Sequence, residues 1–340
     1  MINLTRRYTI MKKISFFDTK PYDKQFFDEE LKKYPAYKMI YHEEKLNAKT
    51  AVLAKGSDAV VAFVNDDLSA DTLRKLRKRD ITCVAMRCAG YNNVDINYAA
   101  EHGMRVTRVP AYSPYAVAEH AMGMLLTLNR KLHRAYNRIR ENNFSLNGLI
   151  GFDLHGKTVG VIGTGKIGRV FMDICKGFGM TVVAYDPYPI VNSNIHYVSL
   201  DELFEKSNII SLHCPLTKDS HHIINAKAIK KMKDGVVILN TSRGALIDSE
   251  ALVEGLKTGK IRAAALDVYE EEADIFYEDN SNTIIQDDVL ARLISMPNVL
   301  ITSHQAFLTE EALGNIAETT MKNLDQFFTG ASLENEVKNI

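Results

Sequence analysis

Three side chains with complementary chemistry lie in the last third of the sequence, each just after an apolar, strand-like run. They are Arg243 in VVILNTSRG, Glu272 in AAALDVYEEE and His304 in NVLITSHQA. Open α/β sheets place their chemistry in the loops that follow the carboxyl ends of their strands. A guanidinium can bind a carboxylate, and an imidazole next to a carboxylate can deliver a proton. These residues are therefore the candidate catalytic set for a reaction that protonates an anionic substrate.

Spacing alone leaves other interpretations of these three residues open. Arg243 also fits the surface of a loop. Glu270, Glu271 and Glu272 are consecutive, and a solvated acidic patch would have the same pattern. A lone histidine is more often structural or exposed than catalytic. His304 becomes the expected proton donor only if the chain binds a hydride-donating cofactor, because the reduction of a ketone requires both a hydride and a proton.

The clearest motif is a glycine fingerprint between a strand-like run and a helical pattern, GVIGTGKIG. In such a turn Gly163 permits the tight bend, Gly165 lets a pyrophosphate approach the backbone, and Gly168 lets the helix pack on the strand. Asp186 ends the next strand-like run, VVAYD, where a carboxylate can bind the ribose hydroxyls of NAD and repel a 2′-phosphate. The pattern predicts an NAD site; a purely structural glycine turn is the alternative.

A second candidate anion site follows a strand-like run near residue 85. In RCAGYNNVD, the turn at Ala89 and Gly90 can offer consecutive backbone N–H groups to a carboxylate, with Arg87 close by in the sequence. The alternative is a plain turn in which Asp95 caps the next helix.

Composition excludes several function classes and indicates a compartment. Lys plus Arg and Asp plus Glu both number 42, so no overall field favours nucleic acid or an anionic membrane, and neither partner is expected. The four cysteines form no CxxC pair, which favours free thiols and a reducing, cytoplasmic compartment. His221 and His222 are adjacent, but only Asp219 is near them in the sequence, so no metal site is predicted.

Apolar periodicity predicts two α/β series, and hence two doubly wound parallel sheets. The first series ends near residue 110 and the second begins near residue 157. Between them, apolar residues at steps of three and four predict one helix from residue 114 to 140, roughly 40 Å long, which we expect to cross a domain boundary. The tail from residue 309 is too short for a domain, so we expect it to return to the first one.

Several segments in combination resemble the D-isomer-specific 2-hydroxyacid dehydrogenase family over about residues 12–335, and within it the bacterial fermentative D-lactate branch. They are RCAGYNNVD, VPAYSPYAVAEHA, GVIGTGKIG, NTSRGALID, DVYEEE and HQAF. The resemblance implies a flavodoxin-like substrate-binding domain from residues 11–110 plus 309–340. An NAD-binding Rossmann domain would be inserted at 111–308, with residues 1–10 as an extension. It also implies a cytoplasmic homo-oligomer, a dimer or a tetramer.

The same resemblance assigns roles to individual residues. Arg243, Glu272 and His304 would be the catalytic trio. The NAD contacts would come from Gly163, Gly165, Lys166, Ile167, Gly168, Asp186, Cys214, Pro215, Ser220, Thr241, Ser242 and Asp267. The substrate contacts would come from Arg87, Ala89, Gly90, Tyr112 and Arg243. Ser220 departs from the Asn that the family often has at this position, which puts that one contact in doubt.

The resulting hypothesis is the reversible reduction of pyruvate to D-lactate. NADH would give hydride to the carbonyl carbon, Arg243 would bind the carboxylate, and His304, held protonated by Glu272, would protonate the oxygen. The 2-keto acids that correspond to hydroxyisocaproate, hydroxypyruvate and glyoxylate are alternative substrates. A non-catalytic, NAD-sensing corepressor is the alternative from another class. Formate dehydrogenases of this superfamily have Gln in place of Glu272.

Overall fold

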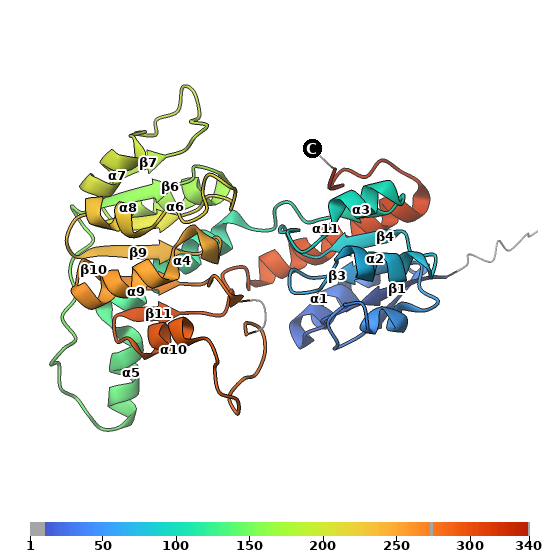
Figure 1. Ribbon diagram of the computed structural model, residues 1–340, viewed down its shortest axis with the longest axis horizontal. Coiled ribbons are helices and arrows are strands. Elements are labelled where there is room, and N and C mark those ends of the chain that lie inside the picture. The colour runs from blue at the N-terminus through green and yellow to red at the C-terminus, as the bar shows by residue number, and fades with distance from the viewer. Residues whose placement is uncertain (1–10, 273–274, 339–340) are drawn as a thin grey trace, which may run out of the picture. The chain divides into compact units, whose positions relative to one another are not determined.

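The computed structural model describes residues 11–272 and 275–338, so the predicted extension at residues 1–10 lies outside the described residues. The chain divides into two compact units: unit 1 is Met1–Ser113 with Leu308–Ile340, and unit 2 is Pro114–Phe307. The boundaries expected from the sequence were 110/111 and 308/309. Each unit contains one parallel sheet with helices (Figure 1), which confirms the predicted fold class.

Unit 1 contains a five-stranded sheet in the order β2-β1-β3-β4-β5, the flavodoxin-like order. Its strands are β1 Lys12–Phe16, β2 Tyr37–Tyr41, β3 Ala59–Ala62, β4 Cys83–Met86 and β5 Arg105–Thr107. Its α-helices are α1 Pro21–Leu31, α2 Ala70–Arg77, α3 Ile96–Glu101 and α11 Glu310–Thr329, and Thr50–Ala54 is a 3-10 helix. The strand-like runs that the sequence shows in this unit are KISFFDT, DAVVAFVN, ITCVAMRCAG and MRVTRVP, and none of them covers β2. This strand lies at the sheet edge and only Met39 is buried in it, so it lacks the continuous apolar run of an inner strand.

The C-terminal segment is part of unit 1. Helix α11 packs on α1 and β4, and its buried side chains recur at steps of three and four residues. Thr309 caps its first turn by accepting from the N–H of Ala312, and Gly330 ends it in the left-handed conformation. The N–H of Val337 then donates to the carbonyl of Val106 on β5. The tail therefore contributes both a helix and an edge contact to this sheet.

Unit 2 contains a six-stranded parallel sheet in the order β11-β10-β9-β8-β6-β7. Its strands are β6 Thr158–Ile162, β7 Thr181–Tyr185, β8 Ile209–Leu212, β9 Val236–Asn240, β10 Ile261–Leu266 and β11 Val299–Ile301. Its α-helices are α4 Pro114–Arg130, α5 Leu132–Arg140, α6 Lys166–Gly177, α7 Leu200–Lys206, α8 Ala226–Lys231, α9 Ser249–Thr258 and α10 Asp288–Ser295, and Gly244–Leu246 is a 3-10 helix.

Both faces of this sheet are covered, which explains why its strands are apolar throughout. On β9, Val237 and Leu239 pack with α4 and α6, whereas Val236 and Ile238 pack with α7 to α10. The strand order reverses at β6, with β7 on one side and β8 on the other. A ligand crevice is expected at such a reversal, outside the carboxyl ends of the strands. The register places Asn240, Leu266 and Ile301 side by side, so the loops after β9, β10 and β11 begin at one edge.

The prediction of one long helix from residue 114 to 140 was wrong. Helix α4 ends at Arg130 and α5 begins at Leu132, because Lys131 lies between them with a left-handed φ of 51°. Helix α4 also begins at the first residue of unit 2, so it does not cross the boundary between the units. The apolar spacing continues through Lys131 because α5 is itself amphipathic, and spacing does not report a change in backbone direction. Within the described residues, no helix combines the length and apolarity needed to span a membrane.

Candidate active site

In the glycine turn after β6, packing requires glycine at positions 163 and 168 but not at position 165. Gly163 has a φ of 98°, and a Cβ there would lie 2.6 Å from the backbone nitrogen of Cys214. A Cβ on Gly168 would lie 2.1 Å from the carbonyl oxygen of Gly163. A Cβ on Gly165, at the N-cap of α6, would meet nothing within 4 Å. Gly165 thus leaves open space at a helix N-terminus, where backbone N–H groups bind phosphates, and the site fits a dinucleotide.

Asp186, just after β7, is oriented by the same turn. Its Oδ2 accepts from the N–H of Thr164 at 2.7 Å and from the Thr164 hydroxyl at 2.9 Å, and its Oδ1 accepts from the N–H of Tyr188 at 2.9 Å. Partial burial would raise the pKa of Asp186, but these hydrogen bonds outweigh it and hold the pKa below its ordinary value. The carboxylate is therefore charged and fixed beside the glycine turn, as an acceptor for ribose hydroxyls.

His304 and Glu272, which follow β11 and β10, form a hydrogen-bonded pair. His304 Nδ1 lies 2.7 Å from Glu272 Oε1, and Glu272 Oε2 accepts from the N–H of Tyr269 at 2.9 Å. Both side chains of the pair are about one-fifth exposed. The carboxylate occupies one ring nitrogen of His304 and fixes the orientation of the imidazole. The other nitrogen, Nε2, is the atom that can donate a proton to a substrate.

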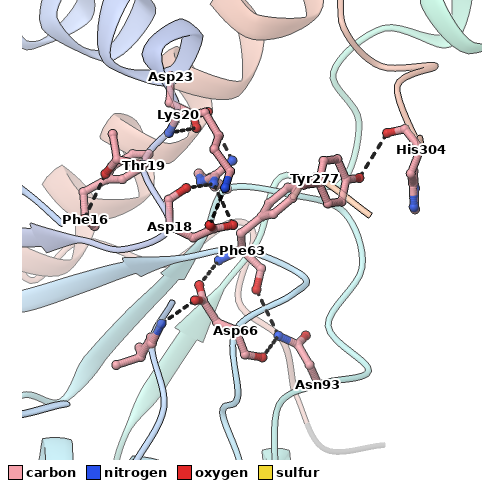
Figure 2. A network of polar contacts seen from close by, with 12 residues as sticks. Phe16, Asp18, Thr19, Lys20, Asp23, Phe63, Asp66, Asn93, Tyr277 and His304 are labelled. Carbon is pink, nitrogen blue, oxygen red and sulfur yellow. Dashed lines mark hydrogen bonds and ion pairs between the residues drawn. The ribbon is translucent and has the colours of Figure 1, made fainter. Parts of the chain in front are cut away.

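The backbone at His304 is held in a left-handed conformation, with a φ of 49°. Its N–H donates to the carbonyl of Asp267 at 2.7 Å, and its carbonyl accepts from the hydroxyl of Tyr277 at 3.0 Å, a contact that Figure 2 shows. A non-glycine residue in this region is strained and persists only where its surroundings fix it. These bonds therefore fix the direction of the imidazole.

Arg243 follows β9, in a loop that touches the Glu272 loop. Its Nη1 donates to the carbonyl of Ser242 at 2.7 Å, and its own carbonyl accepts from Asn240 Nδ2 at 2.8 Å. A Cβ on the next residue, Gly244, would lie 2.0 Å from the backbone of Tyr269, so only glycine allows the two loops to approach this closely. Among the described residues, no carboxylate forms an ion pair with the Arg243 guanidinium. It is half-buried and can bind a substrate carboxylate.

Comparison with known proteins identifies the family. Residues 122–306 match the family described as D-isomer specific 2-hydroxyacid dehydrogenase, NAD binding domain. The D-lactate dehydrogenase of Escherichia coli (strain K12) is 51% identical over 328 residues, 96% of this chain and 99% of that protein. A 2-hydroxyacid dehydrogenase homolog of Haemophilus influenzae is 53% identical with the same coverage. The structure described as the pyruvate reductase of Chlamydomonas reinhardtii has a TM-score of 0.91 and 43% identity, covering 96% of this chain and 99% of that one.

This chain belongs to the D-isomer-specific 2-hydroxyacid dehydrogenase family. It is an oxidoreductase with an NAD-binding domain, which confirms the enzyme class and the cofactor predicted from the sequence. Lys166 and Ile167 of the dehydrogenase are the first two residues of α6, so their N–H groups lie at the free N-terminus of that helix. Their contact with NAD remains a prediction.

The other predicted NAD contacts lie in loops after β8 and β9. The Ser242 hydroxyl donates to the carbonyl of Cys214 at 2.6 Å and joins the two loops. The Ser220 hydroxyl donates to the carbonyl of Pro215 at 2.7 Å, so in this dehydrogenase Ser220 closes its own turn. The Thr241 hydroxyl is buried and has no hydrogen-bond partner in the described part of the chain. A buried polar group without a partner is uncommon, and a polar group of the cofactor would satisfy it.

Asp267, a predicted NAD contact, also supports the loop that contains His304. Its side chain is fully buried, and its two oxygens accept from the N–H groups of Gln305 and Ala306 at 2.9 Å each. The Thr302 hydroxyl also donates to it, at 2.5 Å. These contacts fix the loop that contains His304. A contact between Asp267 and NAD remains a prediction.

The structure also corrects the role predicted for Arg87, in unit 1. Its side chain is 2% exposed, with Nη1 3.1 Å from Asp23 Oδ1 and Nη2 2.8 Å from the carbonyl oxygen of Asp18. The guanidinium also lies 4.0 Å from the centre of the Phe63 ring. Figure 2 shows Asp18, Asp23 and Phe63 gathered in this network. A guanidinium enclosed in this way holds the end of β4 in place and does not grip a substrate.

The remaining predicted substrate contacts lie in loops of unit 1. The carbonyl of Ala89 accepts from Arg108 Nη1 at 3.1 Å, and the carbonyl of Gly90 accepts from the Cys88 thiol at 3.2 Å. The carbonyl of Tyr112 accepts from Asn315 Nδ2 at 2.6 Å. Asp95 caps α3 through the N–H of Tyr98, as the plain-turn alternative expected. Substrate binding by Ala89, Gly90 and Tyr112 remains a prediction.

Sequence reasoning missed two side-chain contacts in the loops of the candidate site. Glu270 pairs with His222, although 48 residues separate them. Tyr277 binds the carbonyl of His304 from a loop that carries no motif. Neither contact has a local signal in a single sequence, because each depends on how loops after different strands meet. The order of strands in the sheet would have placed His222 and Glu270 near each other, but it would not have predicted the geometry of their contact.

Proposed function

We propose that this enzyme is an NAD-dependent D-lactate dehydrogenase that reduces pyruvate to D-lactate reversibly. The observation that carries the proposal is the 2.7 Å hydrogen bond between His304 Nδ1 and Glu272 Oε1, on the same sheet edge as the glycine turn. Similarity to the D-lactate dehydrogenase of Escherichia coli and to the pyruvate reductase of Chlamydomonas reinhardtii supports pyruvate among the possible 2-keto acids.

Each residue of the trio then has a defined task. The bound cofactor supplies or accepts the hydride. Arg243 binds the substrate carboxylate with its planar fork and polarises the carbonyl oxygen. His304 donates the proton on Nε2 to that oxygen, and Glu272 keeps the ring oriented. In the direction of lactate oxidation, His304 begins neutral and removes the hydroxyl proton.

The direct test is NADH oxidation, followed by absorbance, with a panel of 2-keto acids. The panel contains pyruvate, glyoxylate, hydroxypyruvate and the keto acid of hydroxyisocaproate. The product is then analysed on a chiral column. We expect the highest kcat/KM with pyruvate and D-lactate as the product. A higher kcat/KM with another keto acid would assign a different substrate, and NADH binding without turnover of any of them would favour an NAD sensor.

Asp186 should determine the preference for NADH over NADPH. Replacing Asp186 by Ser removes the charge that repels a 2′-phosphate, so we expect the ratio of kcat/KM for NADH to that for NADPH to fall about tenfold or more. Steady-state kinetics with both cofactors measure this ratio. The matched control is Asp173→Ser, which removes an exposed acid from α6. An unchanged ratio in the Asp186 variant would contradict its role in recognising the ribose.

We also propose that the enzyme is a cytoplasmic homo-oligomer that associates through α5 and residues 141–150. Helix α5 has no buried residue, and this segment exposes large apolar side chains. The most exposed are Tyr136 at 62%, Phe144 at 71%, Leu146 at 80% and Ile150 at 80%. Figure 1 shows the segment extending away from the sheet of unit 2. Several large, exposed apolar side chains in one segment are typical of protein–protein contacts, and the four free cysteines suit a reducing compartment.

A charge placed in this segment should prevent association. We expect the double variant Phe144→Asp, Leu146→Asp to sediment as a smaller species than the wild type, because an unpaired buried carboxylate is costly at an interface. Val191→Asp is the control, since Val191 is 83% exposed but lies elsewhere on unit 2. Sedimentation velocity measures the mass. An identical mass for the wild type and the double variant would exclude this surface.

A further inference from the structure

A second histidine–glutamate pair lies next to the candidate catalytic pair in unit 2. His222 Nε2 is 2.6 Å from Glu270 Oε1, and the other carboxylate oxygen of Glu270 accepts from the Ser249 hydroxyl at 2.9 Å. The side chains are 31% and 23% exposed, so solvent screens this pair only partly. Of the three consecutive acids, Glu270 and Glu272 therefore each bind one histidine, whereas Glu271 is exposed.

This second pair joins the loops that follow three neighbouring strands. His222 belongs to the loop after β8, and its N–H donates to the carbonyl of Ala245, after β9, at 2.9 Å. Its side chain then reaches Glu270, after β10. His222 has a left-handed φ of 50°, a conformation that these contacts hold in place. The connected loops contain the proposed NAD contacts, Arg243 and Glu272.

Glu270 also bears directly on the orientation of Glu272. Its backbone follows Tyr269, whose N–H donates to Glu272 Oε2 at 2.9 Å. The backbone of Tyr269 and Glu270 lies against Gly244 with no room for a Cβ. A displacement of Glu270 would therefore move both the donor that orients Glu272 and the loop that contains Arg243. The side chain of Glu270 is the anchor that opposes this displacement.

A metal site is the competing interpretation of these residues. Ligand atoms of His221, His222 and Glu270 lie within 4.8 Å of one another. However, the two imidazole rings stack, with their centres 3.9 Å apart and their planes inclined by 27°. Lone pairs on ring nitrogens lie in the ring plane, so two nearly parallel rings do not direct them at one ion. His222 Nε2 is also already engaged by Glu270.

We propose that His222 and Glu270 are positioning residues that hold Glu272 against His304 and keep the loops after β8, β9 and β10 in register. This inference rests on the proposed function, since it assigns the pair a task in the same reaction. The pair does not touch the substrate or transfer a proton. It preorganises the catalytic loop, so its loss lowers turnover more than it weakens binding.

The test compares His222→Leu and Glu270→Gln with the neighbouring controls His221→Leu and Glu271→Gln. In the first two variants we expect kcat to fall about tenfold, the effect of one charge-assisted hydrogen bond, while KM and the Kd for NADH rise by a smaller factor. His222→Gln, which keeps a donor, should restore most of kcat. Both controls should match the wild type.

Each outcome decides the inference. A wild-type kcat in His222→Leu and Glu270→Gln would overturn it, as would an equal fall in the controls. If the thermal transition shows that His222→Leu does not fold, kcat and KM are compared in Glu270→Gln and His222→Gln instead. Loss of wild-type activity in a chelator, with recovery on adding Zn²⁺, would favour the metal site instead. If the wild type prefers another 2-keto acid, the proposed substrate fails, but the same comparison is made with that keto acid.

Discussion

Replacement of His304 by Gln is expected to lower kcat for pyruvate reduction by about 10²–10⁴-fold, the usual contribution of a positioned general acid. Glutamine has a similar size and can still donate a hydrogen bond to Glu272, but it cannot release a proton. Binding of NADH should be unchanged, because the glycine turn and Asp186 are in other loops of unit 2. Steady-state kinetics and a fluorescence titration with NADH measure these two quantities separately.

The matched control for this variant is His196→Gln, which changes an exposed histidine elsewhere in unit 2. This control should keep wild-type turnover and show that the assay does not respond to the loss of any imidazole. A His304→Gln enzyme with nearly normal kcat would remove His304 from the mechanism. A variant that has lost NADH binding as well would show that the substitution disturbs the loop, and the experiment would be repeated with His304→Asn.

The parts of the site that were predictable are those where one backbone feature requires one residue type. Gly163 and Gly168 follow directly from the tight turn between a strand and a helix, and this turn is visible in a single sequence. The parallel sheets were predictable for a similar reason. Strands covered on both faces must be apolar throughout, and such runs alternate with amphipathic helices. The edge strand β2 escaped prediction because one of its faces is not covered in this way.

The sequence could not predict which partners a charged side chain contacts in the folded protein. Arg87 and Arg243 both follow strands and both looked suited to bind a carboxylate. The structure encloses Arg87 with Asp18 and Asp23, whereas Arg243 has no acidic partner among the described residues. Likewise, the sequence does not show that Asp267 is buried and supports the His304 loop through three donors. These differences depend on contacts between residues far apart in sequence.

Arg243 is the second residue with a large expected effect, because no acidic side chain among the described residues pairs with its guanidinium. In Arg243→Gln we expect kcat/KM for pyruvate to fall about 10²–10⁴-fold. Each charge-assisted hydrogen bond to the substrate carboxylate contributes roughly 1.5–3 kcal/mol, and the variant lacks two of them. Arg243→Lys keeps the charge without the planar guanidinium, so its kcat/KM for pyruvate should lie between those of Arg243→Gln and the wild type. We compare the steady-state kinetics of these two variants with those of Arg292→Gln, a control that replaces an exposed arginine on α10.

Methyl pyruvate makes this experiment specific to the carboxylate. The ester has the same ketone but no negative charge, so the wild type should reduce it far more slowly than pyruvate. Arg243→Gln should lose much of the preference for pyruvate, because the residue that distinguishes the two compounds is gone. If the variant were slow with pyruvate but kept the full preference, the carboxylate would be bound elsewhere. Ala89 and Gly90, whose N–H groups remain predicted anion ligands, would be the next residues to test.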